Sequence, residues 1–361
     1  MRILQLIDTL APGGAERMAV NYANAIFRAT GYSAIVATRR SGPLATLLEP
    51  HVRQLDLRRR HTLDLRALFR LRRFIVSERI TVLHAHSTSL FLAILIKLTL
   101  PSVTILWHDH YGDSEFLDRR PAKMIRLCLP LVASVIAVNQ KLEEWVRRQG
   151  HKSVIVLPNF TSPPNTVAAP LVTLGGTSGS RIICLANLRP QKDHFMLLDA
   201  MQLVLQSNPG ATLHLVGQDF ADNYSRAVRD RIESNKDLST SVFLYTDCYD
   251  SFELIRQCDI GVLSSRSEGL PVALLEYGIC GKPVVVTGVG DITRVVENDV
   301  NGLCCIPGDA VAFSNAILRL LDSTKLRSDL GEDLYKRIDT YFSEVNAMIP
   351  YFRLIKSPGD A

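Results

Sequence analysis

Two glutamates eight residues apart, Glu268 and Glu276, have the residue type and spacing to bind a polar ligand in this 361-residue chain. The apolar run 260–263 precedes them and predicts a buried strand. Pro271 suits the first turn of a helix, because its φ is already helical and a first-turn N–H has no intrahelical partner. We therefore expect Glu268 in a strand-to-helix loop and Glu276 about a turn and a half into the helix.

A loop of this kind favours an anionic ligand that is rich in hydroxyl groups. The free N–H groups and the positive dipole of a first helical turn attract phosphate. Carboxylates accept hydrogen bonds from hydroxyl groups. A sugar nucleotide has both features. Taken alone, however, two glutamates at this spacing favour a plainer interpretation, a solvated helix and its capping loop, so the rest of the chain must discriminate.

The composition is that of a globular protein long enough for two domains. Hydrophobic residues make up 47% of the chain and charged residues 21%, which argues against disorder. The apolar stretch 90–96 is far shorter than the roughly 20 residues that a bilayer span needs, so we expect a buried helix there. Residues 1–8 include Asp8 and no small-residue cleavage site, which indicates a first core strand and not a signal peptide.

The seven cysteines indicate a reducing compartment. They form no C-x-x-C pair, and several of them lie in apolar runs. We interpret them as buried thiols and not as a disulfide framework or a metal site. The expected location is therefore the cytoplasm.

The charge is unevenly divided. Residues 1–160 hold 23 Lys and Arg against 12 Asp and Glu, a net charge of +11, which leaves −6 for residues 161–361 of the +5 total. The arginine-rich stretch 57–77 predicts an amphipathic helix that either lies on an anionic membrane or is simply a solvated helix over a core strand. No aromatic platform accompanies these arginines, so we do not expect nucleic acid as a partner.

Strands and helices alternate along the whole chain, which predicts an α/β protein with parallel sheets. We expect an N-terminal domain at 1–165, a linker at 166–180, a C-terminal domain at 181–340 and a closing helix at 341–361 that crosses back to the N-terminal domain. The Pro-, Gly-, Ser- and Thr-rich composition around the linker, which has no charge, marks the boundary.

Polar residues gather at the ends of the expected strands 81–87 and 103–112. They are His84, His86, His108, Asp109 and His110. Four histidines at two strand ends could ligate a metal. An H-x-H pair on a strand without an obvious third ligand is a weak metal signal, and acid–base or hydroxyl-binding roles fit better.

Several motifs together resemble those of a known family. They are Ser267-Glu268-Gly269-Leu270-Pro271 with Glu276, Gly281-Lys282-Pro283-Val284-Val285, and Asn301-Gly302-Leu303. The chain resembles retaining glycosyltransferases of family 4, of the bacterial surface-polysaccharide type, whose hallmark is E-x7-E. The resemblance covers nearly the whole chain and implies a GT-B fold, with two Rossmann-like parallel-sheet domains facing a cleft.

The resemblance also implies a set of donor-binding residues. Glu268 would bind hydroxyls of the donor sugar near the reacting face, and Glu276 would bind the ribose. Lys192 and a nearby arginine would neutralise the diphosphate leaving group. Where the family usually has that arginine, five residues before the lysine, this chain has Asn187, so we expect Arg189 to take over the contact. The rest of the expected donor site is Gly13, Gly14, Gly269, Leu270 and Pro271.

On the acceptor side, the resemblance implies that His108 is the catalytic-site histidine, with His110 as the alternative. His86 and Asp109 are further acceptor-side candidates. No metal is expected at the site.

The expected function is that of a retaining, metal-independent glycosyltransferase. It would use a nucleotide-diphosphate sugar as donor, need no cofactor, and act on a glycan or lipid-linked acceptor for a cell-surface polysaccharide. The enzyme would be cytoplasmic, and contact with anionic lipid would make it peripheral on the inner face of the membrane. The alternatives are a sugar-nucleotide epimerase of the same architecture and a basic nucleic-acid-binding protein.

Overall fold

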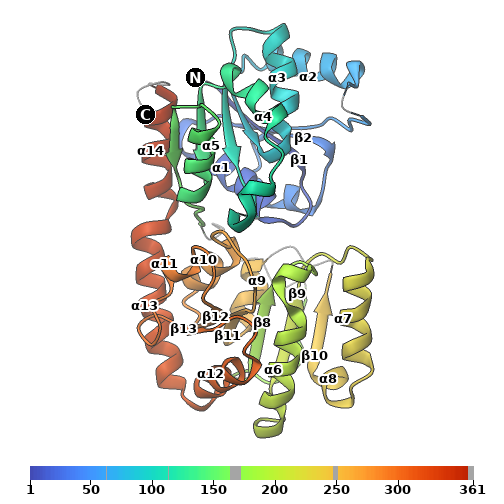
Figure 1. Cartoon of the computed structure of the whole chain (residues 1–361), viewed down its shortest axis with the longest axis vertical. Helices are drawn as coiled ribbons and strands as arrows, with labels where there is room; N and C mark the ends of the chain where they lie inside the picture. The colour runs from blue at the N-terminus through green and yellow to red at the C-terminus, as the bar shows by residue number, and fades with distance from the viewer. Residues whose placement is uncertain (62, 113, 163–171, 247–250, 357–361) are drawn as a thin grey trace. The chain divides into compact units, whose positions relative to one another are not determined.

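The computed structural model divides the chain into two compact units (Figure 1). Unit 1 comprises Met1–Phe160 and Glu344–Ala361, and unit 2 comprises Thr161–Ser343. The residues described are 1–61, 63–112, 114–162, 172–246 and 251–356. Residues 166–171 of the expected linker therefore lie outside the described residues. Each unit is considered by itself.

Unit 1 is built on a parallel sheet, which has seven strands in the described residues, in the order β3-β2-β1-β4-β5-β6-β7. The strands are β1 (Ile3–Thr9), β2 (Ala34–Arg40), β3 (Arg53–Asp56), β4 (Val82–His86), β5 (Thr104–Asp109), β6 (Ser134–Ala137) and β7 (Val154–Val156). The strand β3 was not expected, because its four residues are half-buried or exposed at the sheet edge and form no apolar run.

Helices cover both faces of this sheet. They are α1 (Gly14–Thr30), α2 (Leu65–Ser77), α3 (Leu90–Thr99), α4 (Lys123–Cys128), α5 (Gln140–Arg148) and α14 (Glu344–Lys356). Buried side chains of α2, α3, α4 and α5 form one apolar cluster with the strands. The helices α1 and α14 contribute Tyr22 and Tyr351, which pack against each other and against His84 on the other face.

The basic helix α2 is shorter than expected. It begins at Leu65, because the Asp64 side chain accepts a hydrogen bond from the Ala67 N–H and so caps the helix. Residues 57–61 before it are not helical, and Arg58 has a positive φ of 53°.

Unit 2 is built on a second parallel sheet, which has six strands in the described residues, in the order β10-β9-β8-β11-β12-β13. The strands are β8 (Arg181–Leu185), β9 (Thr212–Val216), β10 (Val242–Tyr245), β11 (Ile260–Leu263), β12 (Val284–Thr287) and β13 (Leu303–Cys305).

The helices of unit 2 again lie on both faces of the sheet. They are α6 (His194–Ser207), α7 (Asn223–Glu233), α8 (Lys236–Ser241), α9 (Ser251–Gln257), α10 (Val272–Ile279), α11 (Ile292–Val295), α12 (Ala310–Asp322) and α13 (Thr324–Phe342). One apolar cluster joins α6, α7, α8 and α12 to the sheet, and another joins α9, α10, α11 and α13 to its other face. Pro271 is the N-cap residue of α10, one position before the helix that we expected it to enter.

Two further expectations concern the cysteines and the membrane. The six cysteines in the described ranges are free thiols, and three of them are buried. Cys248 lies outside those ranges. Among the helices described, none combines the length and the apolarity that a bilayer span requires.

Each sheet has one point where the strand order reverses direction, which we call its switch point. In unit 1 this point lies between β1 and β4, and in unit 2 it lies between β8 and β11. Parallel α/β sheets bind ligands at such points, in the crevice outside the carboxyl ends of the strands. The loops that follow these four strands are therefore where a ligand site is expected.

Candidate active site

The unit 2 switch point brings together two residues that are 76 positions apart in the chain. Lys192 follows β8 and Glu268 follows β11, and Lys192 Nζ lies 2.5 Å from Glu268 Oε1. The Ser265 hydroxyl donates a second hydrogen bond to the same oxygen, at 2.6 Å. The Glu268 side chain is 9% exposed and the Lys192 side chain 20% exposed. The two loops therefore meet at the carboxyl ends of β8 and β11, where Lys192 contacts Glu268.

Two further contacts tie these loops together. Arg266 Nε lies 2.6 Å from Asp193 Oδ2, and Arg266 Nη2 lies 3.1 Å from Asp193 Oδ1, a bidentate ion pair. The Ser264 hydroxyl donates to the Lys192 carbonyl at 2.9 Å. Asp193 is buried and has a left-handed φ of 50°. This fixed geometry holds Lys192 in place, because the residue after it is anchored.

The loop after β12 also packs against the loop that carries Glu268. The Asp291 N–H donates to the Gly269 carbonyl at 3.2 Å, and the Thr287 hydroxyl donates to the Ser265 carbonyl at 2.6 Å. Gly290 has a positive φ of 53°, and a Cβ built there would lie 1.9 Å from the Glu268 carbonyl oxygen. A glycine is therefore required for the two loops to approach this closely.

The second glutamate lies on α10, as expected, and Glu276 is buried. Its neighbour Tyr277 anchors that helix to the switch-point strand, because the Tyr277 hydroxyl accepts a hydrogen bond from the Leu185 N–H at 2.7 Å and donates to the Ile183 carbonyl at 3.2 Å. Burial raises the pKa of Tyr277 well above its usual value, so the phenol stays protonated.

The two candidate cations differ in their surroundings. Arg189 is exposed, and its guanidinium stacks over the Phe220 ring at 4.3 Å from the centroid. Lys192 is partly buried against Glu268. Both stand in the β8 loop, and the structure gives direct contact with the glutamate to Lys192. A third cation in these loops, Arg266, was missed by sequence reasoning, although its place two residues before Glu268 was a usable signal.

In unit 1, Gly13 and Gly14 stand where β1 gives way to α1. Gly13 is the N-cap residue of this helix, and a Cβ there would meet the Glu16 carboxylate. A Cβ on Gly14 would meet nothing within 4 Å, so the protein's own packing leaves the space beside Gly14 open. The α1 N-terminus and this open space lie at the unit 1 switch point.

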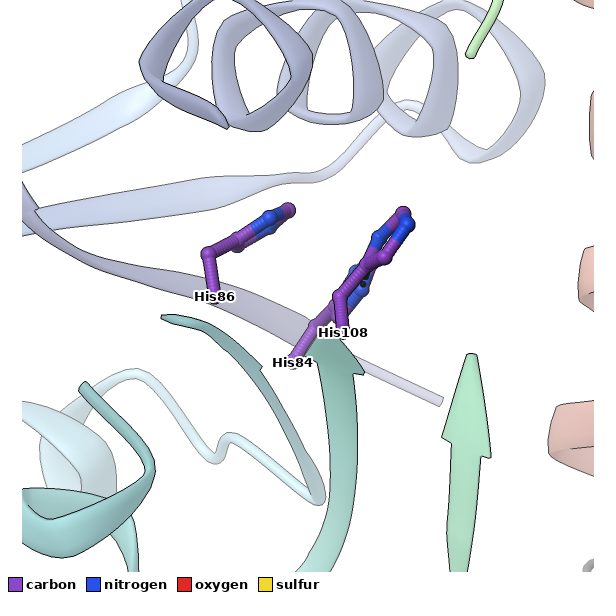
Figure 2. A group of neighbouring side chains, drawn as sticks. All are labelled: His84, His86 and His108. Carbon is purple, nitrogen blue, oxygen red and sulfur yellow. Dashed lines mark hydrogen bonds between the residues drawn. The ribbon is translucent and has the colours of Figure 1, made fainter. Parts of the chain in front are cut away.

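Four histidines cluster at the carboxyl ends of β4 and β5. Figure 2 shows His84, His86 and His108, whose rings rise from the strands toward the same side. Hydrogen bonds join His84 Nε2 to His108 Nδ1 at 3.2 Å and His86 Nδ1 to His110 Nε2 at 2.9 Å. Burial lowers the pKa of His84, His86 and His108 well below the usual value and that of His110 to about 3, so all four are neutral.

Neutral imidazoles could hold a metal ion, and the structure supplies the third ligand that the sequence did not show. Nitrogen atoms of His84, His86 and His108 all lie within 4.8 Å of one another. However, the rings are stacked, with only 6° between the planes of His84 and His108. Nitrogen lone pairs that coordinate one ion must converge, and stacked rings direct theirs alongside one another. The geometry favours a hydrogen-bonded cluster over a metal centre.

The acceptor-side candidates differ in how far they are exposed to solvent. His86 and His108 are buried, whereas His110 is partly exposed. Asp109 is also buried and forms a bidentate ion pair with Arg120, at 2.6 and 2.9 Å. That carboxylate has its own partner, so its evident role is to hold the loop after β5 in place.

Comparison with solved structures gives the fold a class. The complex of Anabaena HepE with UDP-glucose has the same fold, with a TM-score of 0.78, 20% identity, and coverage of 99% of both chains. Two parallel-sheet α/β units of this kind define a two-domain, Rossmann-like GT-B fold.

Sequence relationships give the family. Residues 12–163 match Glycosyltransferase Family 4, and residues 177–337 match Glycosyl transferases group 1. The chain belongs to these glycosyltransferases. The UDP-Gal:alpha-D-GlcNAc-diphosphoundecaprenol alpha-1,3-galactosyltransferase of Escherichia coli is 24% identical over 338 residues, which is 83% of this chain and 85% of that protein.

A second relative matches over a shorter stretch. The N,N'-diacetylbacillosaminyl-diphospho-undecaprenol alpha-1,3-N-acetylgalactosaminyltransferase of Campylobacter jejuni is 38% identical over 84 residues, which is 23% of this chain and 22% of that protein.

Proposed function

We propose that the enzyme transfers a sugar from a nucleoside-diphosphate sugar to a lipid-linked acceptor, with retention at the anomeric carbon and without a metal ion. The observation that carries this proposal is the Lys192–Glu268 contact at the unit 2 switch point. It places a cation suited to a diphosphate beside a carboxylate suited to sugar hydroxyls. The names of the Escherichia coli and Campylobacter relatives, which both specify diphospho-undecaprenol acceptors, support the lipid-linked acceptor.

In this proposal Lys192 does the work that a metal ion would otherwise do. Negative charge develops on the leaving diphosphate as the glycosidic bond breaks, and a cation fixed beside it lowers the barrier. Arg189 stands in the same loop as Lys192 and adds positive charge. The Asp193–Arg266 pair keeps Lys192 positioned, and the N-terminus of α10 adds dipole N–H groups near Glu268.

The two glutamates have separate roles in this proposal. Glu268 accepts hydrogen bonds from donor-sugar hydroxyls, and Glu276, buried on α10, binds the ribose. The open space at Gly14 and the α1 N-terminus offer unit 1 a surface for phosphate groups of the donor. His110, the partly exposed histidine, accepts a hydrogen bond from the acceptor hydroxyl.

The experiment is a transfer assay with a panel of nucleotide sugars and an undecaprenyl-diphosphate-linked acceptor. We expect one donor to be consumed only when the acceptor is present, with the product's anomeric configuration matching the donor's. Activity should survive treatment with a metal chelator. Donor conversion without acceptor would favour the epimerase, and activity restored only by a divalent ion would make the histidine cluster a metal centre. Failure of every donor to bind would overturn the proposal.

We further propose that unit 1 lies against an anionic membrane through α2 and α4. The side chains of Leu65, Phe69 and Val76 on α2 are 63%, 68% and 55% exposed. On α4, Met124 and Leu127 are 59% and 71% exposed. The helix α3 packs against both α2 and α4, so the three helices are neighbours in this unit.

Exposed basic residues lie on the same two helices as the apolar ones. They are Arg66, Arg70, Arg72, Arg73, Lys123 and Arg126. Apolar side chains that enter the interface and cations that meet lipid phosphates together give peripheral binding. The lipid part of a lipid-linked acceptor is held in the membrane, so this contact would bring the enzyme to its substrate on the inner face of the membrane.

A further inference from the structure

The histidine cluster contains two hydrogen-bonded chains that run side by side, and they differ in where they end. One runs from Tyr351 through His84 to His108, with distances of 3.0 and 3.2 Å. It ends at His108 Nε2, a buried atom with no hydrogen-bond partner among the described residues. It reaches no surface from which it could meet a substrate.

The second chain runs from Gln5 through His86 to His110 and does reach the surface. The Gln5 Oε1 atom lies 2.8 Å from His86 Nε2, and His86 Nδ1 lies 2.9 Å from His110 Nε2. Gln5 and His86 are fully buried, whereas His110 is partly exposed. Gln5 lies on β1, one of the two strands at the unit 1 switch point.

The direction of this chain follows from its first atom. The structure places the Gln5 carboxamide oxygen against His86 Nε2. With the amide in this orientation His86 carries its proton on Nε2, because a carboxamide oxygen only accepts hydrogen bonds. A neutral imidazole has one N–H and one lone pair, so His86 Nδ1 is an acceptor and His110 must donate to it from Nε2. The only nitrogen left on His110, Nδ1, then carries a lone pair.

We propose that Gln5 and His86 are positioning residues that fix the tautomer of His110, so that His110 Nδ1 accepts a hydrogen bond from the hydroxyl group of the acceptor substrate. This inference rests on the proposed glycosyl transfer and names the residues that prepare its acceptor side. It assigns a purpose to a glutamine within the apolar run at the start of β1 and to a fully buried histidine.

The chemistry of the chain explains why a neutral glutamine starts it. A carboxylate in place of the Gln5 amide would favour a proton on His86 and make both of its nitrogens donors. His110 Nε2 would then have to accept, and its proton would move to Nδ1, where it would repel a hydroxyl hydrogen. With its pKa held at about 3 by burial, His110 stays uncharged at neutral pH and orients the hydroxyl without taking up its proton.

The test is the tautomer of each histidine, read from long-range proton–nitrogen correlation spectra of protein labelled with 15N in histidine. We expect both His86 and His110 in the Nε2–H form in the wild-type protein. In Gln5→Leu, which keeps the volume and removes the acceptor, His110 should shift to the Nδ1–H form. The kcat for transfer should fall roughly tenfold or more, the worth of one hydrogen bond, while the KM for the donor stays unchanged.

A second variant keeps the test decisive if Gln5→Leu does not fold. Gln5→Glu retains an acceptor oxygen, and at mildly alkaline pH, where His86 is neutral, it should restore the wild-type tautomers and the wild-type kcat. Wild-type His110 in the Nδ1–H form would overturn the proposal, as would a Gln5→Leu protein whose tautomers or kcat match the wild type. Failure of the proposed function would show differently, as absent transfer in a wild-type protein whose spectra still display the chain.

Discussion

Lys192 Nζ and Glu268 Oε1 lie 2.5 Å apart at the carboxyl ends of β8 and β11. The opposite charges of the ammonium and the carboxylate therefore neutralise each other. A donor that binds both residues must replace this contact with two of its own.

The approach of Gly290 to the Glu268 carbonyl can be tested with a matched pair of substitutions. Gly281→Ala places a side chain at a φ of +65° with nothing within 4 Å, and it should cost about 1–2 kcal/mol of stability without altering kcat. Gly290 has a similar φ of +53°, and the Cβ of Gly290→Ala would in addition clash with the Glu268 carbonyl oxygen. Thermal unfolding should show a larger loss for Gly290→Ala, and transfer should fall at least tenfold.

Equal kcat values for the two alanine variants would contradict this account. The loop after β12 would then not be a support for Glu268, and the close approach would be a matter of packing alone.

The buried histidines predict acid sensitivity well above the pH range of carboxylate titration. Burial lowers the pKa of His194 to about 4, whereas an unfolded histidine titrates near 6.5. The unfolded chain therefore binds more protons below pH 6.5. The stability contributed by each neutral histidine is fully present above about pH 6.5 and is lost as the pH falls toward the folded-state value.

Urea unfolding at several pH values measures this effect. Each such histidine should add about 1.4 kcal/mol per pH unit to the slope below pH 6.5. His194→Gln should reduce that slope by its own share, whereas His61→Gln, at an exposed position, should leave it unchanged. A stability that is flat between pH 6.5 and 5 would contradict the burial of these rings.

Membrane binding should depend on the exposed residues of α2. Replacing Arg66 and Arg73 with Gln removes two charges, each worth about 1 kcal/mol near an anionic surface, so liposome binding should weaken roughly tenfold or more. Phe69→Ser should weaken it further by removing an apolar anchor. The matched controls in unit 2 are Lys325→Gln with Lys336→Gln.

Flotation with liposomes of increasing anionic lipid content is the measurement. Binding that ignores lipid charge would contradict the electrostatic part of the account. If the unit 2 control variants lost as much liposome binding, the assignment of the membrane-binding surface to α2 and α4 would be wrong.

The strands were predictable from the sequence because most of them are buried on both faces and read as apolar runs ending in polar residues. The strand β3 was not predicted for the opposite reason, because Arg53–Asp56 lies at the sheet edge and its side chains are half-buried or exposed. The start of α2 was misplaced because arginines at 57–60 continue the helical composition, whereas the Asp64 cap sets the true beginning.

The meeting of the Lys192 and Glu268 loops could be predicted because it depends on strand order alone. Lys192 and Glu268 follow neighbouring strands of one sheet, so their loops had to meet. The roles of Gln5 and Asp109 were not predictable in this way, because they depend on side chains from other elements, His86 and Arg120. A polar residue inside an apolar strand, such as Gln5, is the signal that could have revealed the first of these contacts.

The central claim is that Lys192 binds the donor diphosphate while Glu268 serves the sugar. Calorimetric titration with UDP, followed by the other nucleoside diphosphates, tests it in the wild type, Lys192→Met, Glu268→Gln and the surface control Lys336→Met. Loss of a charge-assisted hydrogen bond should weaken binding roughly 10- to 100-fold in Lys192→Met only. Glu268→Gln, which frees the lysine, should bind the nucleotide at least as tightly as the wild type yet fail to transfer sugar. Wild-type affinity in Lys192→Met would contradict the claim.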